Sequence, residues 1–237
     1  SVTGVQTCAL PILDAAVLEG VDEHNSIEEI VTGRFALALY RDQIDRTSDH
    51  AELALRLPPF VTPVLLYVNE GASNIIANYA YLARATLQFH GDESPADCEE
   101  ATLGGRRAYL RAARIPLGDG ASAFDLVKYA QDYSHAQAIL LDAHVEGYGG
   151  GGKAFNWSLL PTSVDAHLVL SGGLNAANVG DGILQVRPRC KTLAVDVSSG
   201  VEADGPDGQT LKGVKDASKI RRFVDAVRKA DQQLATA

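Results

Sequence analysis

Short apolar runs recur along this chain, and segments with helical periodicity separate them. The runs are Val64–Val68, Thr86–Phe89, Tyr109–Ala112, Ala138–Leu141, His167–Leu170 and Leu193–Val197. Runs that are apolar throughout, instead of alternating with polar residues, are typical of parallel strands covered on both faces. We therefore predict repeated strand–helix–strand units with right-handed crossovers.

Helical patterns fall between the predicted strands. We expect helices near residues 72–81, 95–103, 122–131, 175–185 and 216–233. In the last of these, Ile220, Phe223 and Val227 share one helix face, and basic residues gather towards its end.

The number of strands favours a closed barrel. Phe35–Tyr40 makes a seventh strand, a helix is expected near 48–56, and the eighth strand falls on Val5–Leu10. We therefore predict an α/β fold of the (β/α)₈ TIM-barrel type with an atypical first strand region. An open doubly wound sheet is the alternative. Such a barrel forms one domain of about 250 residues, and we expect a single domain over residues 13–237.

Residues 1–12 do not look native to such a domain. The chain of 237 residues contains no methionine, and its opening SVTGVQTCALPI does not resemble a secretory signal. We expect this segment to be foreign to the protein.

Composition limits the partners and the compartment. A formal net charge of -9 argues against nucleic acid as a partner. No run of 18 apolar residues exists, so we expect no membrane partner. The cysteines Cys8, Cys98 and Cys190 lack CxxC spacing, which favours the reducing cytoplasm and no metal site.

Asp142 is the first candidate for chemistry, because active sites of such barrels lie at the C-terminal ends of the strands. Asp142 ends a predicted strand, and a loop with four glycines, 149–152, leads from it to Lys153. Glycines let the backbone approach a ligand closely, and a carboxylate there suits general acid–base chemistry. The alternative is that Asp142 caps a helix beside a merely flexible loop.

Glycine-rich turns follow the last two predicted strands. Gly172–Gly173 comes after the seventh, and Ser198–Gly200 comes after the eighth. Many barrels bind phosphate at these two places through backbone N–H groups. We expect Asn175 to be the N-cap of the helix after the first turn.

At this point the residues resemble a known family. The segments LLDAHVEGYGGGGKAFNWSLL, LVLSGGLNAANV, LAVDVSSGVE and KDASKIRRFVDAVRKA resemble phosphoribosylanthranilate isomerase in spacing as well as in residue type. LQFHGDE and LPPFVTPVLLYVN match the fourth and third strand regions of that family. The resemblance extends from Leu57 almost to the end of the chain.

The resemblance implies an aldose–ketose isomerase of tryptophan biosynthesis. Its Amadori rearrangement converts N-(5-phosphoribosyl)anthranilate to 1-(2-carboxyphenylamino)-1-deoxyribulose 5-phosphate without a metal or an organic cofactor. The partner would be this small phosphorylated substrate, and the protein would be a monomer or a homodimer. A catalytically impaired barrel that only binds a phosphorylated sugar is the alternative. Indole-glycerol-phosphate synthase would need lysines on the early strands, and the first lysine here is Lys128.

The resemblance also assigns roles to residues of the predicted site. Asp142 matches the general acid that protonates the ring oxygen. Four residues match positions that hold the phosphate: Gly172, Gly173, Ser198 and Ser199. Asp196 would contact the substrate or orient a neighbouring group.

Three further residues are candidates with open alternatives. His90 lies at a strand end and is either catalytic or structural. Arg46 loosely matches an arginine that would bind the anthranilate carboxylate in a bidentate manner, although a surface arginine is the alternative. The segment with Arg111 and Arg114 is expected to face the ligand.

Cys8 matches the family's general base, a cysteine at the end of the first strand that acts as a thiolate. The match is limited to VQTCAL, where Ala9 stands in place of the family's glycine. Residues 22–34 and 41–50 also depart from the family pattern. The alternative is that Cys8 belongs to the foreign segment and has no role.

Overall fold

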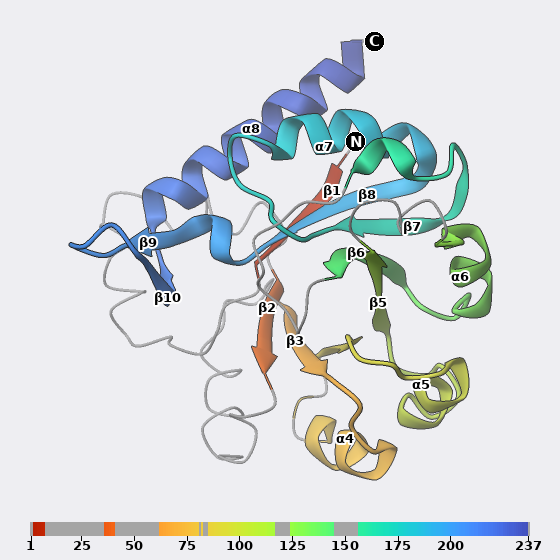
Figure 1. Cartoon of the computed structure of the whole chain (residues 1–237). Helices are drawn as coiled ribbons and strands as arrows, with labels where there is room; N and C mark the ends of the chain where they lie inside the picture. The colour runs from red at the N-terminus through yellow and green to blue at the C-terminus, as the bar shows by residue number, and fades with distance from the viewer. Residues whose placement is uncertain are drawn as a thin grey trace.

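A computed structural model of the chain describes residues 2–7, 36–40, 62–80, 82, 85–116, 124–144 and 156–236. Eight parallel strands close into a barrel in the order β1 to β8 (Figure 1). They are β1 Val2–Thr7, β2 Ala36–Tyr40, β3 Thr62–Tyr67, β4 Thr86–Phe89, β5 Tyr109–Pro116, β6 Ala138–His144, β7 Val164–Leu170 and β8 Cys190–Val197. The predicted barrel is confirmed, and the open sheet is excluded.

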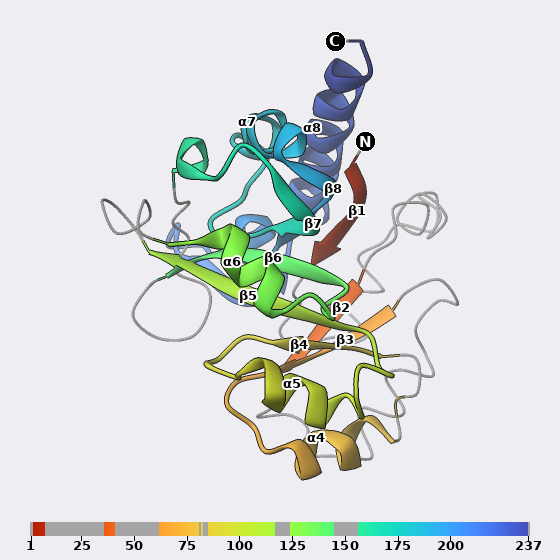
Figure 2. The ribbon, with the colours of Figure 1, turned by 90° about the vertical axis from the view of Figure 1, so that its right-hand side faces the viewer.

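Helices cover the outside of the barrel. Among the described residues, the α-helices are α4 Ala72–Tyr79, α5 Pro95–Ala101, α6 Leu126–Asp132, α7 Val179–Val186 and α8 Ala217–Thr236. The short 3₁₀ turns are η3 Trp157–Leu159, η4 Arg187–Arg189 and η5 Ser199–Val201. A hairpin of β9 Glu202–Asp204 and β10 Thr210–Lys215 lies between β8 and α8. Helices α7 and α8 lie on one side of the barrel and α4 and α5 on the opposite side (Figure 2).

Two hydrophobic clusters reflect the alternation of side chains along the strands. The inner cluster consists of Leu110, Ala112, Ala138, Leu140 and Val169. The outer cluster lies between the strands and the helices and takes the alternate positions, such as Phe89, Leu141 and Leu170. Because successive strand residues point to opposite faces, this pattern places Gln88, His90, Asp142, Ser171 and Asp196 on the inner face.

The first strand closes the barrel between β8 and β2. Val5 pairs with Val195, and Thr7 pairs with Leu37. Its bounds differ from the predicted Val5–Leu10, because its pairing with β8 begins at Val2. That residues 1–12 are foreign to the domain stays a prediction. The helix near 48–56 and the four-glycine loop lie outside the described residues.

The start of α7 corrects the predicted N-cap. The helix begins at Val179, and the preceding residue is Asn178, not Asn175. The carboxamide oxygen of Asn175 instead accepts the backbone N–H of Ala177 at 2.8 Å. This bond forms a turn at Asn175–Ala177, before the helix. The helix therefore starts later than its sequence pattern indicates.

Among the described residues, no helix has the length and apolarity needed to cross a membrane.

Candidate active site

Asp142 lies at the C-terminal end of β6, and its carboxylate has two hydrogen-bonding partners. Oδ2 is 3.0 Å from Nε2 of His90, and Oδ1 accepts the backbone N–H of Ala143 at 2.9 Å. Strand β5 separates β4 from β6, so the His90 and Asp142 side chains meet across the inside of the barrel. Their exposed fractions are only 9% and 14%. A carboxyl and an imidazole in contact can hold a proton and transfer it to a ligand.

Gln88 continues this chain of side chains into the barrel. Its amide Nε2 lies 3.1 Å from Nδ1 of His90, and the residue is completely buried. Gln88 was not among the site residues predicted from the sequence. Its position two residues before His90 could have indicated it, because residues two apart on a strand share a face.

The loop after β4 is held in place by a buried carboxylate. Glu93 accepts the backbone N–H of Asn69 at 2.7 Å and that of Gly91 at 2.9 Å. Asn69 in turn accepts the backbone N–H of Asp92 at 2.6 Å. These bonds join the end of β3 to the loop that follows His90, which fixes the position of the imidazole.

Arg111 supports the same loop from outside the barrel. Its guanidinium donates to the backbone carbonyls of Phe89, Gly91 and Glu93 at 3.0 to 3.1 Å. It also lies 3.3 Å from the Glu93 carboxylate and 4.9 Å from the ring centre of Tyr133. The expectation that Arg111 faces a ligand is therefore wrong, because its position on β5 points outward into the helix layer.

Arg114, three residues further along β5, forms an ion pair with Asp92 of the loop after β4. Asp92 is largely exposed there. In the strand register Arg114 is paired with Asp142 of β6. Of the two arginines expected to face the ligand, Arg114 thus lies beside the candidate site.

The turn after β7 packs directly against Asp142. Gly172 and Gly173 have φ values of +77° and +66°, which favour glycine. A Cβ on Gly172 would lie 2.6 Å from Oδ1 of Asp142. The carbonyl of Gly173 accepts a hydrogen bond from the Asn178 side chain at 2.9 Å. The turn therefore keeps its shape next to the carboxylate.

The turn after β8 touches the turn after β7. A Cβ on Gly200 would lie 1.9 Å from the carbonyl oxygen of Leu174. The ammonium of Lys215 donates to the carbonyl of Ser198 at 2.9 Å and pairs with Glu202 at 3.1 Å. A buried ion pair on the β9–β10 hairpin thus supports this second turn.

Asp196 is buried next to the first turn. Its Oδ2 accepts a hydrogen bond from the Ser171 hydroxyl at 3.2 Å. This contact joins the ends of β7 and β8 inside the barrel.

These contacts bring most of the predicted site residues to the C-terminal ends of the strands, which we call the C-terminal rim. The residues gathered there are His90, Asp142, Gly172, Gly173, Asp196, Ser198 and Ser199. Cys8 and Arg46 lie outside the described residues. Among the described residues, no cluster of three or more metal-binding side chains occurs.

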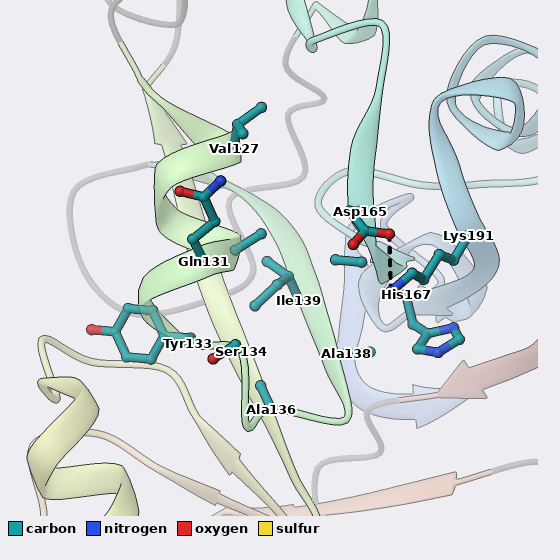
Figure 3. Close-up of a pocket in the computed structure, with 12 residues that line it drawn as sticks. Val127, Gln131, Tyr133, Ser134, Ala136, Ala138, Ile139, Asp165, His167 and Lys191 are labelled. Carbon is teal, nitrogen blue, oxygen red and sulfur yellow. Dashed lines mark ion pairs between the residues drawn. The ribbon is translucent and has the colours of Figure 1, made fainter.

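A cavity of about 300 Å³ lies elsewhere in the molecule (Figure 3). Helix α6 lines one side of it, and the first residues of β6, β7 and β8 line the other. Asp165 and Lys191 form an ion pair of 2.9 Å at its edge. Because Ala138, the first residue of β6, lines the cavity and Asp142 lies near the end of that strand, this cavity is separate from the candidate active site.

A closed barrel with a carboxyl–imidazole pair at its C-terminal rim defines a (β/α)₈-barrel enzyme of the acid–base type. The family described as N-(5'-phosphoribosyl)anthranilate (PRA) isomerase matches residues 20–226. An N-(5'-phosphoribosyl)anthranilate isomerase of Methylibium petroleiphilum is 48% identical over 236 residues, covering 98% of this chain and 97% of its own. The chain belongs to the N-(5'-phosphoribosyl)anthranilate isomerase family.

Solved structures agree with this assignment. The phosphoribosyl anthranilate isomerase of Thermotoga maritima has a TM-score of 0.70 and 30% identity, covering 96% of this chain and 99% of its own. That enzyme has been described as dimeric and as monomers obtained from the dimer. A structure of phosphoribosyl anthranilate isomerase in complex with reduced 1-(o-carboxyphenylamino)-1-deoxyribulose 5-phosphate has a TM-score of 0.65 and 26% identity, covering 96% of this chain and 99% of that chain. The resemblance seen in the sequence is confirmed.

Proposed function

We propose that this chain catalyses the Amadori rearrangement of N-(5-phosphoribosyl)anthranilate to 1-(2-carboxyphenylamino)-1-deoxyribulose 5-phosphate in tryptophan biosynthesis. One observation carries this proposal. The carboxylate of Asp142 touches the Gly172 turn, so a proton donor and a turn suited to phosphate lie side by side. A substrate that is a sugar phosphate needs both groups, one at its ring and one at its anionic end.

Asp142 is the general acid in this proposal. It donates a proton to the ring oxygen, the bond between that oxygen and the first sugar carbon breaks, and an iminium forms with the anthranilate nitrogen. A base then removes the proton from the second carbon, and the resulting enolamine becomes the ketone. The enolamine becomes the ketone when its hydroxyl loses a proton and the first carbon gains one. Every step after ring opening is thus a proton transfer, so the proposal includes no metal and no organic cofactor. Cys8 is the base that the family resemblance suggests.

The phosphate is bound by the two turns in this proposal. Backbone N–H groups of Gly172, Gly173 and Ser199, together with the Ser198 hydroxyl, would donate to it. The support is the contact between the turns at Gly200 and the ammonium of Lys215 behind Ser198.

The remaining roles concern the other end of the substrate. His90 holds and supplies the proton of Asp142, since the two side chains are in contact. Asp196 orients groups at the rim through Ser171. Arg46 receives the anthranilate carboxylate.

The assembly and location follow from the same proposal. The partner is the small phosphorylated substrate, with no nucleic acid and no membrane, and the protein is a monomer or a homodimer made of one barrel domain over residues 13–237. It works in the cytoplasm, where thiols such as that of Cys98 stay reduced.

Complementation tests this function. The chain is expressed in a tryptophan auxotroph that lacks the isomerase, and we expect growth without tryptophan. The variant Asp142→Ala should fail to support growth, because loss of the acid lowers turnover by roughly 10²–10⁴-fold. Asp165→Ala is the matched control, since this aspartate is 91% exposed at the other end of the barrel.

Two results would contradict the proposal. Growth with Asp142→Ala at the rate of the unchanged chain would exclude Asp142 as the acid. A folded chain that binds the reduced substrate analogue but supports no growth would show an impaired barrel that only binds a phosphorylated sugar.

A further inference from the structure

We propose that Gln88 is a positioning residue whose amide turns to match the protonation state of the His90–Asp142 pair. This inference rests on the proposed function, because it concerns how the general acid is loaded with its proton. It differs from that function in assigning a role to a side chain whose hydrogen-bond partner among the described groups is the imidazole.

The three side chains form a continuous line inside the barrel. Gln88 Nε2 lies 3.1 Å from His90 Nδ1, and His90 Nε2 lies 3.0 Å from Asp142 Oδ2. Both nitrogens of the imidazole are therefore engaged, one by the amide and one by the carboxyl. Because an imidazole nitrogen either carries a proton or accepts one, the group on one side determines what the other side can do.

In the first arrangement, the amide N–H of Gln88 donates to Nδ1 of His90. Nδ1 then has no proton, so the ring proton is on Nε2 and is donated to the carboxylate of Asp142. The pair holds one proton and carries a charge of about -1. In this form Asp142 has no proton to donate.

In the second arrangement, the amide of Gln88 is turned by half a rotation. Its Oε1 accepts a proton carried by Nδ1, and a second proton lies between Nε2 and Asp142. The pair is then neutral and holds the proton that general acid catalysis requires. The amide oxygen and nitrogen are nearly equal in size, so the turn needs no additional space.

The burial of Gln88 makes the orientation of its amide depend on the imidazole. Its Oε1 is buried and has no hydrogen-bond partner among the described residues. A buried acceptor without a partner is costly. Turning the amide gives this oxygen the partner that Nε2 then loses. A protonated Nδ1 can be paired only with the oxygen and an unprotonated Nδ1 only with the N–H, so protonation of the pair and rotation of the amide favour one another.

The other charged groups at this rim have partners of their own. On β5, Arg114 is paired with Asp92 of the loop after β4. On β8, Asp196 is hydrogen-bonded to Ser171 of β7. On β6, Oδ1 of Asp142 accepts the N–H of Ala143. Gln88 is thus the described group that meets His90 on the side away from Asp142.

Nitrogen NMR of histidine-labelled protein tests the proposal on the full chain without substrate. The signal of His90 is identified by its loss in His90→Gln. In the unchanged chain, we expect Nδ1 to lose its proton as the pH rises. In Gln88→Glu, a carboxylate that can only accept should keep Nδ1 protonated to a pH higher by about one unit or more. In Gln88→Leu, which offers neither donor nor acceptor, the preference for the Nε2–H tautomer should weaken, because only the Asp142 carboxylate then favours it.

Kinetics add a second measurement. We expect Gln88→Leu to lower kcat by roughly 10- to 100-fold with KM little changed. Losses of this size are typical when a group that hydrogen-bonds the second ring nitrogen of a functional histidine is removed. Gln88→Glu should move the alkaline limb of the pH profile of kcat to higher pH. Gln185→Leu is the control, because it makes the same change on the exposed face of α7.

The outcomes separate this inference from the proposed function. If the Nδ1 signal of His90 titrates identically in the unchanged chain and in either variant, the inference is overturned, whatever the turnover. If the Nδ1 signal moves as expected but the unchanged chain has no isomerase activity, the inference about Gln88 holds and only the proposed function is contradicted. Either variant alone decides, so misfolding of one leaves the test intact.

Discussion

Gly172 approaches Asp142 so closely that a methyl group on its Cα would lie 2.6 Å from Oδ1 of the carboxylate. The two residues come from different strands, β6 and the end of β7. The same added atom would lie 2.8 Å from the backbone nitrogen of Ala143, which donates to that oxygen. The position of the proposed acid is therefore determined by a turn that is proposed to bind the phosphate.

Gly172→Ala is expected to impair turnover more than stability. The substitution must displace the Asp142 carboxylate, and a shift of about 1 Å at a reacting group can cost on the order of 10²-fold in rate. Steady-state kinetics should show a fall in kcat of at least about tenfold, and thermal unfolding should show a modest loss.

Gly208→Ala is the matched control for this change. Gly208 has the same φ of +77°, but no atom lies within 4 Å of an added Cβ. It should share the backbone strain of about 1 kcal/mol without the loss of kcat. Equal kcat values for the two variants would show that the contact with Asp142 does not affect catalysis.

The strands could be predicted from the sequence because of their burial. Strands β3 to β8 are covered by helices outside and filled by side chains inside, so each is visible as an apolar run. The same logic located Asp142 and the glycine turns, because barrel chemistry gathers where strands end. The predicted bounds of β1 were less accurate, because a strand's bounds depend on the neighbour with which it pairs.

The relationships inside the site could not be predicted in the same way. Asp142 and Gly172 are 30 positions apart, and their contact results from closure of the barrel. Gln88 interrupts an apolar run as a single polar residue, and no local pattern shows that its amide meets His90. Arg111 was expected at the ligand, but the alternation along β5 directs it outward to the carbonyls of the loop after β4.

Arg111→Met is expected to be strongly destabilising. The guanidinium is buried and is 3.3 Å from the Glu93 carboxylate, which is itself almost inaccessible to solvent. Its removal leaves a buried charge without its partner, which typically costs about 3–5 kcal/mol. Urea denaturation measures this loss. Arg228→Met removes an exposed arginine 4.0 Å from Asp225 and should cost less than about 1 kcal/mol. Similar midpoints for the two variants would contradict the role assigned to Arg111.

Thiol labelling at pH 8 is expected to single out Cys8. Burial raises the pKa of the Cys98 thiol to about 12 and also raises the pKa of Cys190, so neither forms much thiolate at that pH. Folding therefore favours their neutral form, and this contribution to stability is complete below a pH of about 8.5 and declines above it.

Mass spectrometry after brief treatment with iodoacetamide checks this expectation. If Cys8 is the base, one thiol per chain reacts rapidly, activity is lost with it, and Cys8→Ser removes both effects. Rapid labelling of Cys98 in the folded chain would contradict its burial, and full activity after labelling of Cys8 would show that another group is the base.

Gly200→Ala should weaken phosphate binding through a contact between backbones. An added Cβ would lie 1.9 Å from the carbonyl oxygen of Leu174, and a backbone atom cannot move aside as a flexible side chain can. The turn after β8 must therefore separate from the turn after β7, and the N–H groups of both would no longer converge on one anion. We expect KM to rise by roughly tenfold or more, because the phosphate would lose some of the hydrogen-bond donors that hold it.

Gly180→Ala serves as the control, because this glycine lies in α7 with no atom within 4 Å of an added Cβ. Alanine there should leave KM unchanged and stabilise the helix by about 0.5–1 kcal/mol. Because the Cβ added at Gly200 meets the backbone of Leu174 and Asn175 first, inhibition by inorganic phosphate should weaken as KM rises. An unchanged affinity for phosphate would mean that the two turns do not bind the same anion.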